Sequence, residues 1–169
     1  MSTLYVDTIT EKTSGNGVQI PGHVVQFKKT PYISATQAVT SNTFVDVTGA
    51  SLSITPLATN SIILLHWNGH LSGAGSFRFM RNGTALDLSN TAGTYYYWDM
   101  DASGQSGYDN NSTRTRFAEH IYDEPVTISS VTYKVQMAAY ASINNVGFAI
   151  NESGPRREGS YFSLMEIAQ

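Results

Sequence analysis

The residues of this chain whose types and spacing could bind a ligand lie between residues 91 and 113. Asp99, Asp101 and Ser103, with Gly104 after them, match the first half of a calcium-binding loop, which has oxygen ligands at positions 1, 3 and 5 and glycine at position 6. Position 12 is Asn110, where such a loop needs a bidentate glutamate, and no helical pattern flanks it. We therefore expect a solvated loop and no metal site, with calcium binding as the open alternative.

A run of aromatic residues from Tyr95 to Trp98 precedes that loop. Aromatic rings stack on the C–H faces of sugars, while neighbouring amides and carboxylates hydrogen-bond the sugar hydroxyls. The run therefore predicts a carbohydrate-binding site, whose candidate residues are Tyr95, Tyr96, Trp98, Asp99, Asp101 and Tyr108. The alternative is that one alternate pair of these aromatics is the inward-facing set of another strand.

No pattern predicts catalysis or a bound cofactor. The chain has no cysteine and no G-x-S-x-G motif, and its adjacent acids are typical of solvated loops. Its four histidines are scattered, and His66 and His70 would lie about 13 Å apart along one strand, too far to share a metal ion. We expect a non-enzymatic protein in which His66 packs in or beside the core.

Charge and hydropathy exclude two classes of partner. Only 14% of the 169 residues are charged, the net charge is −3, and no cluster of Lys and Arg exceeds a pair. We therefore expect no nucleic-acid binding. No apolar run approaches the roughly 20 residues of a membrane span, and no signal peptide is visible, so we expect no membrane insertion.

The elements that must position these residues are strands, because almost every periodic segment has a period of two. Residues 61–67 are nearly all apolar, which predicts a central strand covered on both faces. Asn82-Gly83 is a strong hairpin signal. Further strands are expected at residues 23–28, 44–47, 52–54, 76–81, 84–88, 114–122, 132–137, 146–150 and 161–167. The chain is therefore predicted to be all-β.

The last predicted strand places apolar side chains on both of its faces. One face can enter the core, and the other, with Tyr161 and Met165, either meets a second copy of the chain or is covered within the monomer. Glu166 lies between apolar neighbours, and a buried carboxylate needs a partner. We expect Arg78 or Arg81 to be that partner.

The first twenty residues read as a short β-hairpin that cannot be stable alone. Its apolar side chains are Leu4, Val6, Ile9, Val18 and Ile20. Burying each contributes roughly 1.5–3 kcal/mol, whereas ordering the backbone costs about 1–2 kcal/mol for every residue. The segment must therefore lie on another surface, and identical copies supply one. The alternative is that the hairpin packs on its own domain.

The same segment resembles the start of fibre and tail-fibre proteins of tailed bacteriophages, particularly marine and cyanobacterial phages. The similarity covers residues 3–26, with the pattern L-x-V-D-T-I followed by T-S-G-x-G-V-x-I-P-G-H-V-V-Q. Later landmarks resemble the jelly-roll heads of such fibres, which are similar to the trimeric complement C1q and tumour-necrosis-factor heads: Phe77, Arg81-Asn82-Gly83, residues 133–136 and residues 164–167.

The resemblance implies a homotrimer with a β-shaft or attachment segment at residues 1–22 and a jelly-roll head at residues 23–169. It implies a virion protein, assembled in the host cytoplasm, that binds other virion proteins through its N-terminal segment and a host surface glycan through its head. Because the shaft is short, a capsid-decorating fibre or a tail or baseplate component is an alternative. A small jelly-roll carbohydrate-active enzyme is the third.

Overall fold

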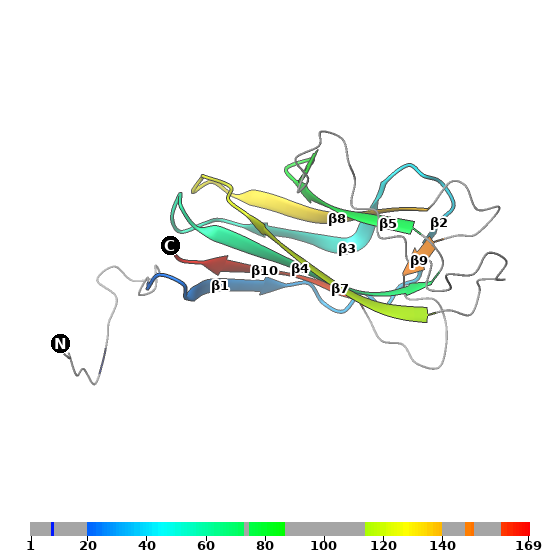
Figure 1. The fold of residues 1–169 in the computed structure, drawn as a ribbon, viewed down its shortest axis with the longest axis horizontal. Coiled ribbons are helices and arrows are strands. Elements are labelled where there is room, and N and C mark those ends of the chain that lie inside the picture. Colours follow the sequence, from blue (N-terminus) through cyan, green and yellow to red (C-terminus); the bar gives the residue numbers. More distant parts are fainter. Residues whose placement is uncertain (1–7, 9–19, 73–74, 87–113, 140–147, 151–159) are drawn as a thin grey trace.

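The computed structural model describes Thr8 and residues 20–72, 75–86, 114–139, 148–150 and 160–169. These residues form ten strands and no helix (Figure 1). In chain order they are β1 (Val24–Lys29), β2 (Gln37–Val39), β3 (Val45–Ile54), β4 (Ile62–Ser72), β5 (Gly75–Arg81), β6 (Thr84–Ala85), β7 (Arg114–Asp123), β8 (Val131–Ala139), β9 (Phe148–Ile150) and β10 (Tyr161–Ile167). The prediction of an all-β chain is confirmed.

The strands form two antiparallel sheets that lie face to face (Figure 1). The six-stranded sheet has the order β1-β10-β4-β9-β2, with β7 also paired to β4. The four-stranded sheet has the order β3-β8-β5-β6. Strands distant in sequence are therefore neighbours, since the last strand β10 lies between β1 and β4.

The core lies between the sheets, and buried residues alternate with more exposed ones along the strands. On β4 the inward residues Ile63, Leu65 and Trp67 are fully buried. Aromatic pairs join the layers: the ring centroids of Trp67 and Phe77 are 5.8 Å apart, and those of Phe79 and Phe162 are 6.1 Å apart. Offset and tilted contacts of this kind stabilise beyond the area that they bury.

The predicted hairpin at Asn82-Gly83 is confirmed. Asn82 has a φ of 48° and Gly83 a φ of 87°, the left-handed pair that a tight two-residue hairpin requires. The Asn82 side chain also accepts a 2.9 Å hydrogen bond from the backbone N–H of Thr132, which fixes the turn against the start of β8.

One expectation about the strands is wrong. Residues 44–47 and 52–54 are not separate strands but belong to the single strand β3, whose register with β8 shifts between Asp46 and Ser51. Gly49, with a φ of 85°, lies in this irregular stretch. The strand therefore continues through a β-bulge at the point where the sequence suggested a break between two strands. The short strand β2 was not predicted at all.

The expectation that residues 61–67 form a central strand is confirmed for β4, which pairs with β10, β7 and β9 and packs one of its faces in the core. Ile62, Leu64 and His66 alternate with the core residues and are half-buried on the other side. Side chains of the neighbouring strands partly cover these three residues, and no described element packs against this face of the sheet. The near-continuous apolar run therefore reflects an apolar outer surface.

Candidate functional site

The main candidate site is the face of the six-stranded sheet that points away from the core. We call it the outer face, and its position follows from strand alternation, because residues between the buried positions must point outward. It is formed by β1, β10, β4 and β7, and its described side chains include Val24, Phe27, Lys29, Ile62, Leu64, His66, His120, Tyr122, Tyr161, Met165 and Ile167.

The centre of the outer face is aliphatic and its margins are aromatic. Leu64 on β4 lies directly opposite Met165 on β10 and Tyr122 on β7, and Met165 lies opposite Phe27 on β1. Leu64 and Met165 are half-buried by their neighbours, whereas Phe27 is 56% exposed and Tyr122 is 59% exposed. One continuous apolar row thus crosses all four strands, and contiguous apolar surface of this kind marks an interaction site.

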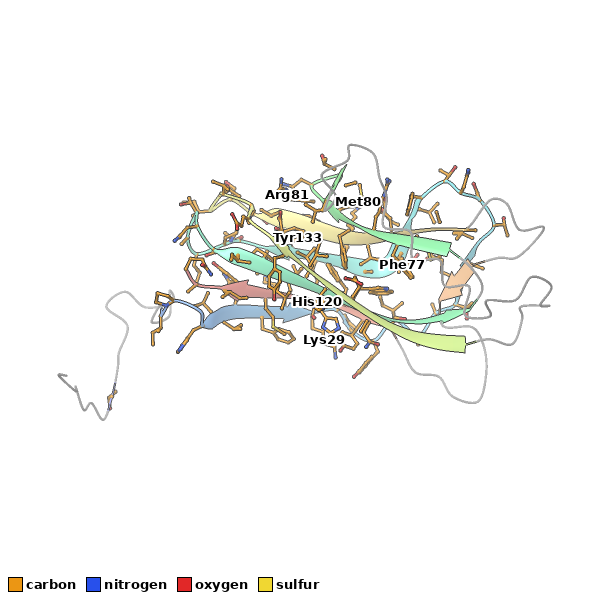
Figure 2. All side chains as sticks on the ribbon, viewed as in Figure 1. Lys29, Phe77, Met80, Arg81, His120 and Tyr133 are labelled. Atoms are coloured by element: carbon orange, nitrogen blue, oxygen red, sulfur yellow. The ribbon has the colours of Figure 1, made fainter. Side chains whose placement is uncertain are left out.

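A cation and two tyrosines form one end of the outer face. The ammonium group of Lys29 lies 4.1 Å from the centroid of the Tyr32 ring and 4.7 Å from that of Tyr161. The two rings meet edge to face, with centroids 5.9 Å apart. Figure 2 shows Lys29 and His120 on the side of the six-stranded sheet away from the other sheet. The rings hold the charge of Lys29 by cation–π attraction.

Two histidines lie side by side on this surface. His66 on β4 is the register partner of His120 on β7. Nε2 of His66 is buried and has no hydrogen-bond partner, and its ring lies 5.8 Å from that of Tyr161. Burial lowers the pKa of His66, and the nearby charge of His120 lowers that pKa further. His66 is therefore a neutral imidazole near pH 7.

The outer side of the four-stranded sheet has the opposite character. The carboxylate of Asp46 accepts 2.7 Å hydrogen bonds from Nζ of Lys134 and from Nε2 of Gln136, and the Lys134 bond is the main reason that the pKa of Asp46 is lowered. The Arg78 guanidinium donates to Gln136 at 2.7 Å and lies 4.2 Å from the ring centroid of Phe44. This polar network is suited to contact with water.

Two buried acids hold the fold together. Glu166 is fully buried and accepts hydrogen bonds from the Ser61 hydroxyl at 2.6 Å and from the Leu57 N–H and Gln26 Nε2 at 2.7 Å each. Asp123 accepts from Arg81 at 2.8 Å and from the Tyr133 hydroxyl at 2.6 Å.

The expected pairing of Glu166 with an arginine is therefore wrong. Arg81 pairs with Asp123, and Arg78 lies in the polar network on the far side of the four-stranded sheet. Neutral donors suffice because a carboxylate needs hydrogen bonds when buried, and several N–H and O–H groups can supply them.

The predicted site residues are distributed as follows. Tyr161 and Met165 lie on the outer face, and Ile20 is 41% exposed just before β1. The other predicted interface residues lie outside the described residues: Leu4, Val6, Ile9 and Val18. The candidate carbohydrate and calcium residues also lie outside them: Tyr95, Tyr96, Trp98, Asp99, Asp101, Ser103, Gly104, Tyr108 and Asn110.

The sequence did not predict that Phe27, Tyr122 and His120 lie on one surface. Alternation could have assigned each to one face of its strand, but only the register of β1, β10, β4 and β7 brings them together. His66 was expected in or beside the core and lies on the outer face instead.

Within the described ranges, no three or more His, Asp and Glu residues gather in a group that could hold a metal ion. The described part of the chain likewise contains no helix of the length and hydropathy needed to cross a membrane. Comparison with known proteins gives no relative: no family model matches this sequence, and no curated protein matches it.

Proposed function

We propose that this chain is a non-enzymatic fibre protein of a tailed-bacteriophage virion. In this proposal residues 1–22 form a β-shaft or attachment segment that binds other virion proteins, and residues 23–169 form a jelly-roll head. Three copies associate, and the head adsorbs to a glycan on the host surface. The protein is assembled in the host cytoplasm and acts as part of the particle.

The observation that carries the proposal is that the N-terminal segment enters the fold at one end of the sheets, whereas the chain returns from residues 87–113 at the other end. Val24, Ile62 and Ile167 lie together at one end, where the N-terminal segment enters β1. Ser72 and Arg114 are partners at the other end, where the chain returns from residues 87–113. Figure 1 shows β1 beginning at the end of the sheets away from the start of β7. In this proposal attachment lies at the end where β1 begins, and recognition belongs to residues 87–113, which leave the described fold beside Phe79 of β5 and return to it at the end where β7 begins.

The buried acids support binding rather than catalysis. A catalytic carboxylate must reach a substrate, often with a pKa adjusted by burial or neighbours. Glu166 and Asp123 instead accept short hydrogen bonds from the protein itself. Both carboxylates are therefore occupied in holding strands and loops together.

Glycan binding by the full-length chain tests the recognition half of the proposal. We expect Tyr96→Ala and Trp98→Ala to reduce binding to a host capsular or lipopolysaccharide glycan by tenfold or more, since each removes a stacking surface. Tyr32→Ala is the matched control, because Tyr32 is an aromatic residue with 66% exposure that is not among the candidate carbohydrate-binding residues. Unchanged binding by both loop variants would contradict the proposed site, and release of sugar product would favour an enzyme.

Incorporation into particles tests the attachment half. Deleting residues 1–19 removes none of the ten described strands, so the head should remain folded while virion incorporation is lost. Immunogold labelling of particles that carry the full chain should mark the tail. Labelling of the capsid would favour the decorating fibre instead.

A further inference from the structure

We propose that the outer face of β1, β10, β4 and β7 is the surface through which copies of this chain meet. The inference rests on the self-association in the proposed function and adds the surface that it uses. The occupant is a second copy of the chain, placed so that Phe27, Leu64, Met165 and Tyr122 become buried between heads.

The contrast between the two sheets is the first argument. The outward side of the four-stranded sheet carries charged and amide groups that are paired with one another, with Asp46 bonded to both Lys134 and Gln136. The outer face of the six-stranded sheet instead presents Phe27 and Tyr122, each more than half exposed. A protein that exposed both sides to water would gain nothing from apolar side chains on only one of them.

The chemistry of the outer face is the second argument. Its described residues include no carboxylate, and the charge of Lys29 is already held between Tyr32 and Tyr161. Along the row from Phe27 to Tyr122 the side chains are apolar apart from the tyrosine hydroxyl, so few groups could hydrogen-bond a sugar or pair with a charged peptide. An apolar centre with aromatic and methionine residues and a polar margin is the composition of a protein–protein interface.

The position of the N-terminal segment favours a second copy over a foreign protein. Continuous description of the fold begins at Ile20, directly after residues 9–19. Only four residues later, at Val24, β1 begins, and β1 belongs to the six-stranded sheet that carries the outer face. Copies joined through residues 1–19 therefore hold their outer faces at a high effective concentration. A contact that is weak between free heads becomes populated when the heads are tethered next to each other.

Sedimentation of the full-length chain tests the inference. We expect the unmodified chain to sediment with three chain masses. A variant with Phe27→Lys and Tyr122→Lys keeps the N-terminal contacts but brings two new charges per copy into the contact between heads, so it should dissociate on dilution at a chain concentration at least tenfold higher. A matched control with Ser51→Lys and Ser53→Lys on β3 should dissociate at the same concentration as the unmodified chain, since both residues are exposed opposite Lys134 and Thr132 on the outward side of the other sheet. Circular dichroism verifies that each variant remains folded.

A second measurement does not depend on a disruptive variant. The chain has no cysteine, so a single Tyr122→Cys substitution gives one thiol on the outer face. We expect that thiol to react with a thiol reagent at least tenfold more slowly than the thiol of Ser51→Cys, which lies exposed on the outward side of the other sheet.

The outcomes separate the two proposals. A double-lysine variant that dissociates at the same concentration as the unmodified chain, together with a freely reactive thiol in Tyr122→Cys, would overturn the outer face as the interface but leave self-association through the N-terminal segment intact. A monomeric unmodified chain would overturn both the interface and the homotrimer, while the glycan and incorporation tests would still decide the rest of the function.

Discussion

The hydroxyl of Tyr133 donates a 2.6 Å hydrogen bond to Oδ2 of Asp123, and this bond joins the two sheets. Tyr133 belongs to β8 of the four-stranded sheet and Asp123 ends β7 of the six-stranded sheet. Arg81, beside the Asn82-Gly83 turn, completes the arrangement through a 2.8 Å bond to Oδ1 of the same carboxylate. A turn and two strands are thus fixed by one buried acid, and Figure 2 shows Arg81 and Tyr133 on the same side of the fold.

Tyr133→Phe should lower the free energy of unfolding by about 2 kcal/mol, the range for a hydrogen bond to a charged group. The ring is fully buried and would keep its packing, so the loss isolates the hydroxyl. Urea unfolding followed by tryptophan fluorescence measures the change. Tyr32→Phe is the control, because its ring is 66% exposed, and a cost similar to that of Tyr133→Phe would contradict the assigned role.

Tyr133 should also make the fold sensitive to alkali. Burial raises the pKa of its hydroxyl, and the bond to Asp123 raises it further. In the unfolded chain a tyrosine ionises near pH 10, so above about that pH the unfolded state holds fewer protons than the folded state and stability falls. We expect urea midpoints of the unmodified chain to drop between about pH 10 and pH 11.5. The drop should be shallower in Tyr133→Phe, and equal slopes would contradict the prediction.

Glu166→Gln should lower the free energy of unfolding by about 1–3 kcal/mol. Oε1 of Glu166 accepts from Ser61 and Leu57, and Oε2 accepts from Gln26. Glutamine replaces one of these acceptor oxygens with an NH2 group, which would then face another hydrogen-bond donor. Glu124→Gln makes the same chemical change at an exposed position and should cost little. Equal urea midpoints for the two variants would show that the buried bonds contribute nothing.

Val126→Gly should stabilise the protein, although it removes a side chain. Val126 is β-branched, 71% exposed and held at a φ of 50°, which costs a residue other than glycine roughly 1–2 kcal/mol. Glycine relieves that strain but loses about 0.5–1 kcal/mol of chain entropy, which leaves a gain of up to about 1.5 kcal/mol. Ile128→Gly in the same loop is the control. Ile128 does not have a positive φ, so Ile128→Gly should only destabilise the protein. The melting temperatures of the two variants measure the difference.

Local pattern was enough to predict most of the fold. Alternation located the buried set of β8, the near-continuous apolar run located the central strand β4, and the Asn82-Gly83 pair located a hairpin, because each signal depends on residues adjacent in sequence. Alternation failed at β3, where a bulge breaks the period without ending the strand.

The partners of the buried acids and the composition of the outer face could not be predicted in the same way. Glu166 is satisfied by residues more than a hundred positions away, and His66 meets His120 only through the register of β4 and β7. Pattern indicates which side of a strand a residue occupies, whereas sheet order decides what lies beside it. Arg78 and Arg81 were expected beside Glu166 because their charge suited it, and the topology places them elsewhere.

The histidine pair on the outer face should make the protein sensitive to acid. His66 faces His120 on β7, Tyr161 and Ser163 on β10, and beyond them Lys29 on β1, so no described carboxylate compensates a proton on its ring.

Burial and the charge of His120 hold the pKa of His66 below its ordinary value. The unfolded chain takes up that proton near pH 6.5, so the contribution of the neutral ring to stability is complete above about pH 6.5 and is lost as the pH falls through the lower folded-state value. If copies meet on the outer face, association should weaken over the same interval, because a proton on His66 would then be buried between heads.

His66→Gln keeps a polar side chain but cannot become charged. We expect its urea midpoint and its sedimentation mass to change less than those of the unmodified chain between pH 7.5 and pH 5. His23→Gln is the control, since His23 is exposed just before β1, and it should retain the acid dependence of the unmodified chain. If His66→Gln loses stability in acid as steeply as the His23→Gln control, another group is responsible and His66 is not the proton-sensitive residue of this surface.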